Sequence, residues 1–154
     1  MPESIRIIGI GNPLMGDDGV GIAAVESLTA MALPEGVEVV DGGTAGLTLL
    51  DLMEGAGTVI LVDAMEMGKP PGTVVRFTPD EVVMTEGEAS LSLHDAGLAQ
   101  VLILGREMDM LPDIVLFGVE PLSVERRPGL SPPVAQALGL LLERILAELG
   151  ASAG

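Results

Sequence analysis

The chain has 154 residues, a formal net charge of −16 and no cysteine. Its length suits one domain with a core large enough to fold unaided, and its 48% hydrophobic content argues against disorder. Only 7 basic residues stand against 23 acidic ones, so no basic patch can neutralise nucleic-acid phosphates, and without cysteine neither disulfides nor thiolate metal sites can form.

The sequence also bears on location. It starts Met-Pro-Glu-Ser-Ile-Arg, which is no signal-peptide pattern, and no apolar run reaches the roughly 18 residues that span a bilayer. We therefore expect a soluble cytoplasmic protein without membrane insertion. The negative charge has two explanations that the sequence leaves open, a solvated acidic surface or the steering of a basic partner or peptide.

The first third of the chain predicts strands that alternate with helices. Residues 5–10 are almost all apolar, as in a strand buried on both faces, and residues 19–31 show a helical stripe. Residues 37–41 predict a second strand, and residues 47–53 predict a short helix.

The middle of the chain begins with a third apolar strand at residues 58–64, which has an acid near its end. Residues 73–77 alternate as an edge strand does, and the acidic residues 79–91 indicate a surface loop. Ser-x-x-Asp at residues 92–95 predicts a helix start, with the helix running to about residue 104 and Gly105 as its cap.

The last third predicts a buried strand at residues 113–119 and a long final helix. Ser131 and Pro132 suit the N-cap and the first helical position. One face of this helix carries large apolar residues, namely Val134, Leu138, Leu141, Ile145 and Leu149. We predict one domain at residues 1–150 and a short tail at residues 151–154.

This alternation predicts an α/β fold: a three-layer sandwich with a twisted, mostly parallel sheet of about five strands and helices on both faces. In such folds ligands bind beyond the carboxyl ends of the strands. Three groups are expected at that edge: Asp18 with its neighbour Asp17, Asp63, and the single histidine, His94. Two carboxylates and an imidazole suit a divalent metal such as Ni, Zn, Mn or Fe and leave positions open for water or substrate.

Each of these residues also has a plainer explanation. Asp17 and Asp18 could cap the following helix and complement its dipole. Asp63 is harder to explain structurally, because an unpaired carboxylate flanked by core residues is costly to bury. A lone histidine near a helix start is commonly structural or exposed.

The glycine-rich stretch at residues 9–14 invites comparison with a dinucleotide fingerprint. It supplies only the first two glycines of G-x-G-x-x-G, and Leu14 stands where the third should be. Asp17 and Asp18 would repel a pyrophosphate, so the match is weak. A second glycine-rich strand end at residues 41–46 either forms a tight turn or shapes a groove for a peptide.

Taken together, these motifs resemble the hydrogenase maturation endopeptidases, which process the large subunit of nickel–iron hydrogenases. The motifs that carry the resemblance, in the family's order and spacing, are residues 9–21 (GIGNPLMGDDGVG), 41–47 (DGGTAGL), 61–64 (LVDA), 92–98 (SLHDAGL) and 116–121 (LFGVEP). They extend over nearly the whole chain. The forms of residues 41–46 and 92–94 are more similar to the branch that serves uptake-type hydrogenases than to the formate-linked branch.

The resemblance implies that Asp18, Asp63 and His94 bind metal and act in catalysis. It implies removal of a C-terminal extension from the hydrogenase large-subunit precursor after nickel insertion, with nickel supplied by the substrate. The site would then be empty or hold another divalent metal in the isolated protein. Many relatives of this branch carry Glu at the position of Asp18, which leaves open whether Asp17 shares the task.

A metal can both polarise a peptide carbonyl and activate water, so metal-assisted hydrolysis fits a chain without cysteine or a placed serine nucleophile. A carboxylate acting as general base is the other open route. The alternatives to an endopeptidase are a non-catalytic assembly module that binds the nickel centre, and a nucleotide-binding α/β domain.

Overall fold

The computed structural model describes residues 4–44, 46–86 and 97–153. Five strands and five α-helices form its framework, with two short 3-10 turns, η1 (Gly16–Gly19) and η2 (Gly46–Thr48). The strands are β1 (Ile5–Gly9), β2 (Val37–Asp41), β3 (Thr58–Ala64), β4 (Val74–Phe77) and β5 (Asp113–Val119). The helices are α1 (Val20–Thr29), α2 (Leu49–Met53), α3 (Pro79–Glu86), α4 (Leu98–Glu107) and α5 (Pro132–Ala153).

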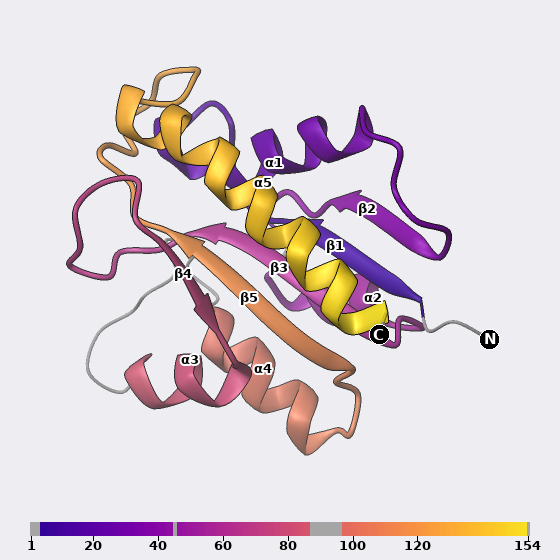
Figure 1. Ribbon diagram of the computed structural model, residues 1–154. Coiled ribbons are helices and arrows are strands. Elements are labelled where there is room, and N and C mark those ends of the chain that lie inside the picture. The colour runs from indigo at the N-terminus through magenta and orange to yellow at the C-terminus, as the bar shows by residue number, and fades with distance from the viewer. Residues whose placement is uncertain (1–3, 45, 87–96, 154) are drawn as a thin grey trace.

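The five strands make one sheet in the order β2-β1-β3-β5-β4, which Figure 1 shows with helices in front and behind. β2, β1, β3 and β5 run parallel, whereas β4 joins the edge antiparallel to β5. The predicted three-layer α/β sandwich with a mostly parallel sheet is confirmed. The carboxyl ends of β1 and β3 lie side by side, because Gly9 is in register with Val62.

Alternating side chains of the sheet build two cores. Ile7, Ile60 and Val62 pack with α1 and α5 on one face. Ile8 and Leu61 pack with α2 and α4 on the other. Every residue of the central strand β3 is buried, as parallel strands covered on both faces require. By the same alternation Asp63 belongs to the face of Leu61, towards α2 and α4.

The prediction of a surface loop at residues 79–91 is wrong in its first part, where α3 forms. The helix starts with a capping box: Glu81 N–H donates to the Thr78 hydroxyl at 3.4 Å, and Thr78 N–H donates to the Glu81 carboxylate at 3.1 Å. Pro79 occupies the first helical position, where its missing N–H costs nothing. Residues 87–91 lie outside the described part of the chain.

The predicted end of the next helix is also wrong. Gly105 lies inside α4, which continues to Glu107. A side chain at Gly105 would come within 2.5 Å of a Leu111 methyl group and 2.8 Å of a Leu50 methyl group, so glycine here allows close packing rather than forming a cap. The start of α4 follows Gly97, and the start signal at residues 92–95 is outside the described residues.

Helix α5 crosses one face of the sheet (Figure 1) and buries four of the five apolar residues predicted for its inner face, Val134, Leu141, Ile145 and Leu149. The fifth, Leu138, is partly buried. It continues to Ala153, and the division at residue 150 into domain and tail stays a prediction. Within the described ranges, no helix combines the length and apolar character that crossing a membrane demands.

Candidate active site

Asp63 lies at the carboxyl end of the central strand. It is the sixth residue of β3, opposite Gly118 of β5, and none of its surface is exposed. The strands on both sides fix its backbone, since Ile10 N–H donates to the Val62 carbonyl at 2.9 Å. A carboxylate held on such a rigid element is well placed for chemistry at the strand ends.

Asp18 is delivered to the same edge by the glycine-rich loop after β1. Gly11 has a φ of 146°, and a side chain there would fall within 1.9 Å of the Asp18 carbonyl oxygen. The loop can therefore close on η1 only with glycine at this position. Asn12 N–H then donates to Oδ2 of Asp18 at 2.9 Å, and only 6% of Asp18 is exposed.

The two carboxylates thus come from the ends of adjacent strands. The turn η1, which carries Asp18, packs against β3, which carries Asp63. Gly21 at the start of α1 lies against the carbonyls of Val62 and Ile10, so the helix begins directly over this edge. Two buried carboxylates here offer hard oxygen ligands for a divalent cation, or a general base.

His94, the third predicted site residue, lies outside the described residues. Within residues 4–44, 46–86 and 97–153, no group of three or more potential metal-binding His, Cys, Asp or Glu side chains is present. The roles of Asp18, Asp63 and His94 as metal ligands and catalytic residues therefore stay predictions.

Asp17 has a different role from Asp18. It is fully buried, and its carboxylate accepts hydrogen bonds from the backbone N–H groups of Leu122, Ser123 and Ser131 at 2.9, 3.2 and 2.7 Å. The Ser131 hydroxyl donates a fourth bond at 2.7 Å. Burial alone would raise the pKa of Asp17, but the hydrogen bonds from Ser131, Leu122 and Ser123 outweigh it, so the pKa lies below its ordinary value.

These hydrogen bonds show whether Asp17 caps helix α1. Gly19 occupies the N-cap position of α1, and the Asp17 carboxylate is directed to residues 122–131 instead of the first helical turn. Asp17 is thus an anchor that holds the segment after β5 against the loop after β1, and the capping explanation is wrong for it.

Glu120 is a buried acid whose role the sequence interpretation missed. It follows β5 directly, and its Oε1 accepts hydrogen bonds from the backbone N–H groups of Met67 and Lys69 at 2.7 and 3.0 Å. It therefore orders the loop after β3, next to Asp63. An acid directly after a buried apolar strand is the same signal that singled out Asp63.

A cavity of about 300 Å³ lies beside this edge, between the loop after β3 and the loop after β5. Its lining includes Glu66, Glu120 and Leu122.

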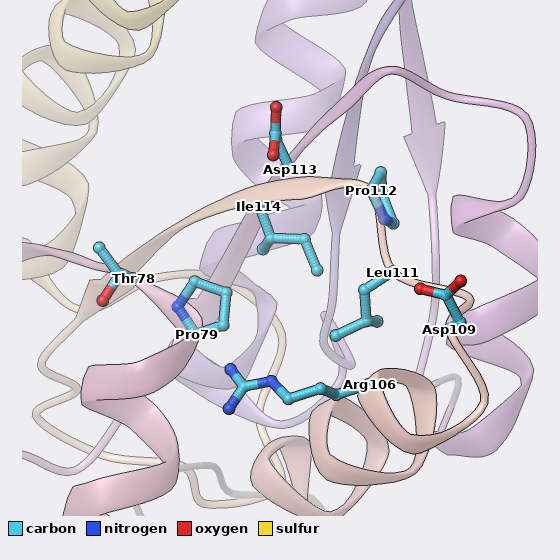
Figure 2. Close-up of a pocket in the computed structure, with 8 residues that line it drawn as sticks. All are labelled: Thr78, Pro79, Arg106, Asp109, Leu111, Pro112, Asp113 and Ile114. Atoms are coloured by element: carbon cyan, nitrogen blue, oxygen red, sulfur yellow. The ribbon is translucent and has the colours of Figure 1, made fainter.

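Another cavity, of about 360 Å³, lies at the opposite end of β5 (Figure 2). There the side chain of Arg106 extends towards Pro79 and pairs with Asp80 at 2.6 Å. This second cavity is separate from the two buried carboxylates, because it lies at the start of β5 and they lie at the strand ends.

Comparison with known proteins agrees with this geometry. A family model described as hydrogenase maturation protease matches residues 22–148. The chain is 37% identical to the hydrogenase expression/formation protein HupD of Rhodobacter capsulatus, over 97% of this chain and 73% of that protein. It is 38% identical to the hydrogenase 2 maturation protease of Escherichia coli, over 94% of this chain and 90% of that protein.

Among solved structures, the hydrogenase maturating endopeptidase HybD from E. coli matches with a TM-score of 0.86 and 37% identity. The match covers 97% of this chain and 93% of HybD. The fold, the family match and the relatives all lead to one conclusion: this chain belongs to the hydrogenase maturation protease family of endopeptidases.

Proposed function

We propose that this endopeptidase removes the C-terminal extension of a nickel–iron hydrogenase large-subunit precursor after nickel insertion. Asp18, Asp63 and His94 recognise the nickel that the precursor carries. The observation that chiefly supports this proposal is the burial of Asp18 and Asp63 at the ends of adjacent strands, next to a cavity. The family supplies the class of reaction, and the two carboxylates supply a means to sense the metal.

The donor set fits a metal that arrives with its substrate. Carboxylates and an imidazole suit a divalent ion of borderline hardness such as nickel. Three protein groups are fewer than a closed structural site uses, so coordination positions stay available for groups of the precursor. His94 lies outside the described residues, and its part in this set rests on the family resemblance.

The chain's own residues have distinct tasks in this proposal. The hydrogen bond from Asn12 N–H orients Asp18, and the paired strand orients Asp63. One of the two carboxylates takes the proton of the attacking water as general base, and the proton then passes to the leaving amine. The metal, when bound, would polarise the scissile carbonyl and ease deprotonation of that water.

A direct test uses candidate precursors with and without nickel and measures their intact mass after incubation. We expect loss of the extension from the nickel-loaded precursor only, and none with the Asp63→Asn, Asp18→Asn or His94→Ala variants. Asp113→Asn, at an exposed acid that starts β5, serves as the matched control and should cleave normally. Thermal unfolding of each variant separates loss of chemistry from loss of fold.

Two outcomes would contradict the proposal. Full processing by His94→Ala or Asp63→Asn would overturn the assigned site. Nickel-dependent binding by the wild type without any change of mass would favour the non-catalytic assembly module.

The cysteine-free chain has no disulfide to form, which agrees with the cytoplasmic location that we propose for the reaction.

A further inference from the structure

Three leucines are unusually exposed at the edge of the sheet that carries Asp18 and Asp63. Leu14, Leu47 and Leu122 are 62%, 58% and 57% exposed, the highest values among the large apolar side chains of the described residues. Leu14 follows β1, Leu47 follows β2, and Leu122 follows β5. Since these strands are parallel, all three leucines lie beyond the same ends of the sheet.

Hydrogen bonds join the three loops into one surface. Gly11 N–H donates to the Gly43 carbonyl at 2.7 Å, which ties the loop after β1 to the loop after β2. Asp17 N–H donates to the Ser123 carbonyl at 2.9 Å, which ties it to the loop after β5. The Asp17 carboxylate adds its own bonds to Leu122 and Ser123. The leucines are therefore presented on connected, ordered backbone around the two buried carboxylates.

Single exposed apolar residues are common, but three on connected loops around a protease site mark an interaction surface. We propose that Leu14, Leu47 and Leu122 form an apolar docking surface for the folded body of the precursor protein. This inference rests on the proposed function and names the part of the enzyme that holds its substrate. It requires no contact between the leucines and nickel.

The width of the surface favours a folded partner over a tail alone. β2 and β5 are separated by β1 and β3, so their ends are roughly 14 Å apart at the usual strand spacing. The rim of the surface carries charges of both signs: Glu125, Arg126 and Arg127 are all exposed. Arg126 and Arg127 follow Leu122, are exposed, and form no ion pair with any described residue. The matching face of the precursor should thus be apolar, with acidic groups where it meets Arg126 and Arg127.

The chain offers a matched control at the opposite end of the sheet. Met108 is 55% exposed and lies after α4, before the start of β5. Met108→Ser replaces a large apolar side chain whose exposed fraction is close to that of Leu122, but away from the site. The test compares it with the triple variant Leu14→Ser/Leu47→Ser/Leu122→Ser and with the three single variants.

Binding is measured by calorimetry with nickel-free precursor, which the proposed reaction leaves uncut, and processing is measured with nickel-loaded precursor. We expect the triple variant to raise the Kd at least about tenfold, since removing three exposed leucine side chains from water favours binding. Its KM should rise in parallel, with kcat changed less than about twofold, and its melting temperature should stay that of the wild type. Met108→Ser should match the wild type in all of these quantities.

Three results would overturn the docking surface. They are wild-type Kd and KM in the triple variant, an equal loss in Met108→Ser, and no measurable binding of nickel-free precursor by the wild type. Failure of the proposed function looks different, because the wild type would then leave nickel-loaded precursor uncut. The binding comparison would still decide the docking surface in that case.

Discussion

Asp17 accepts two hydrogen bonds of 2.7 Å from Ser131, one from its backbone N–H and one from its hydroxyl, across a separation of 114 residues. The same carboxylate accepts bonds from Leu122 and Ser123. One buried side chain thus joins the loop that carries Asp18 to the segment that begins with Leu122 and ends at α5. Asp17 thus has a structural role, whereas Asp18 is the acid that we propose for the strand-end site.

The Asp17→Asn variant should therefore be destabilised. An amide group has one acceptor oxygen, so its NH₂ would face at least one of the donors that now bond to the carboxylate. Leaving buried donors unsatisfied and removing charge-assisted bonds should lower the free energy of unfolding by at least about 2 kcal/mol. Urea denaturation measures this loss. Asp113→Asn, at an exposed position, should change it by less than about 0.5 kcal/mol.

The stabilisation from Asp17 should depend on pH in acid. Its folded-state pKa lies below the ordinary value of 3.8, so the ionised form favours the folded state. The contribution is complete above the unfolded-state pKa and is lost as the pH falls through the folded-state value. The difference in unfolding free energy between wild type and Asp17→Asn should stay constant from pH about 7 to about 5. It should become smaller as the pH falls below the ordinary pKa of an aspartate carboxyl group. A difference that grows in acid would contradict this assignment.

Gly11→Ala should damage the loop that carries Asp18. The added methyl group would overlap the Asp18 carbonyl oxygen, and alanine rarely adopts a φ of 146°. We expect at least about a tenfold loss of precursor processing, with a lower melting temperature. Gly139→Ala is the matched control, because Gly139 is exposed inside α5 with nothing within 4 Å of the added methyl. That variant should gain about 0.5–1 kcal/mol of stability, since alanine favours helix.

Glu120 should order the loop after β3 through its acceptor oxygen rather than its charge. Glu120→Ala would leave the N–H groups of Met67 and Lys69 without their acceptor, whereas Glu120→Gln keeps one. Hydrogen exchange of these two amides should accelerate by about tenfold or more in the alanine variant. The glutamine variant should stay within a few-fold of the wild type. Equal acceleration in both variants would instead assign the effect to the negative charge.

Local sequence signals predicted most of the elements. The predicted strands at residues 37–41, 58–64 and 113–119 coincide with β2, β3 and β5. For β3 and β5 the signal is strong because strands buried on both faces leave little room for polar residues. Helix α3 is not predicted because its acidic composition suggests a loop. Thr78, Pro79 and Glu81 nevertheless form a helix start signal, the capping box with proline at the first helical position. The cap prediction for Gly105 follows from the frequency of glycine at helix ends. It fails because Gly105 packs against Leu50 and Leu111, and such contacts between distant segments are not visible in the local sequence.

The sequence by itself determined the α/β class, the strand-end position of Asp18 and Asp63, and the family resemblance, because periodicity and motif order are local properties of the chain. Only the tertiary structure decided what Asp17 and Glu120 do, because their hydrogen-bond partners lie up to 114 and 53 residues away. It also decided that Leu14, Leu47 and Leu122 share one edge, since strand order and hydrogen bonds between loops bring them there. A buried carboxylate takes its role from the donors that folding places around it, and those donors are set by long-range packing.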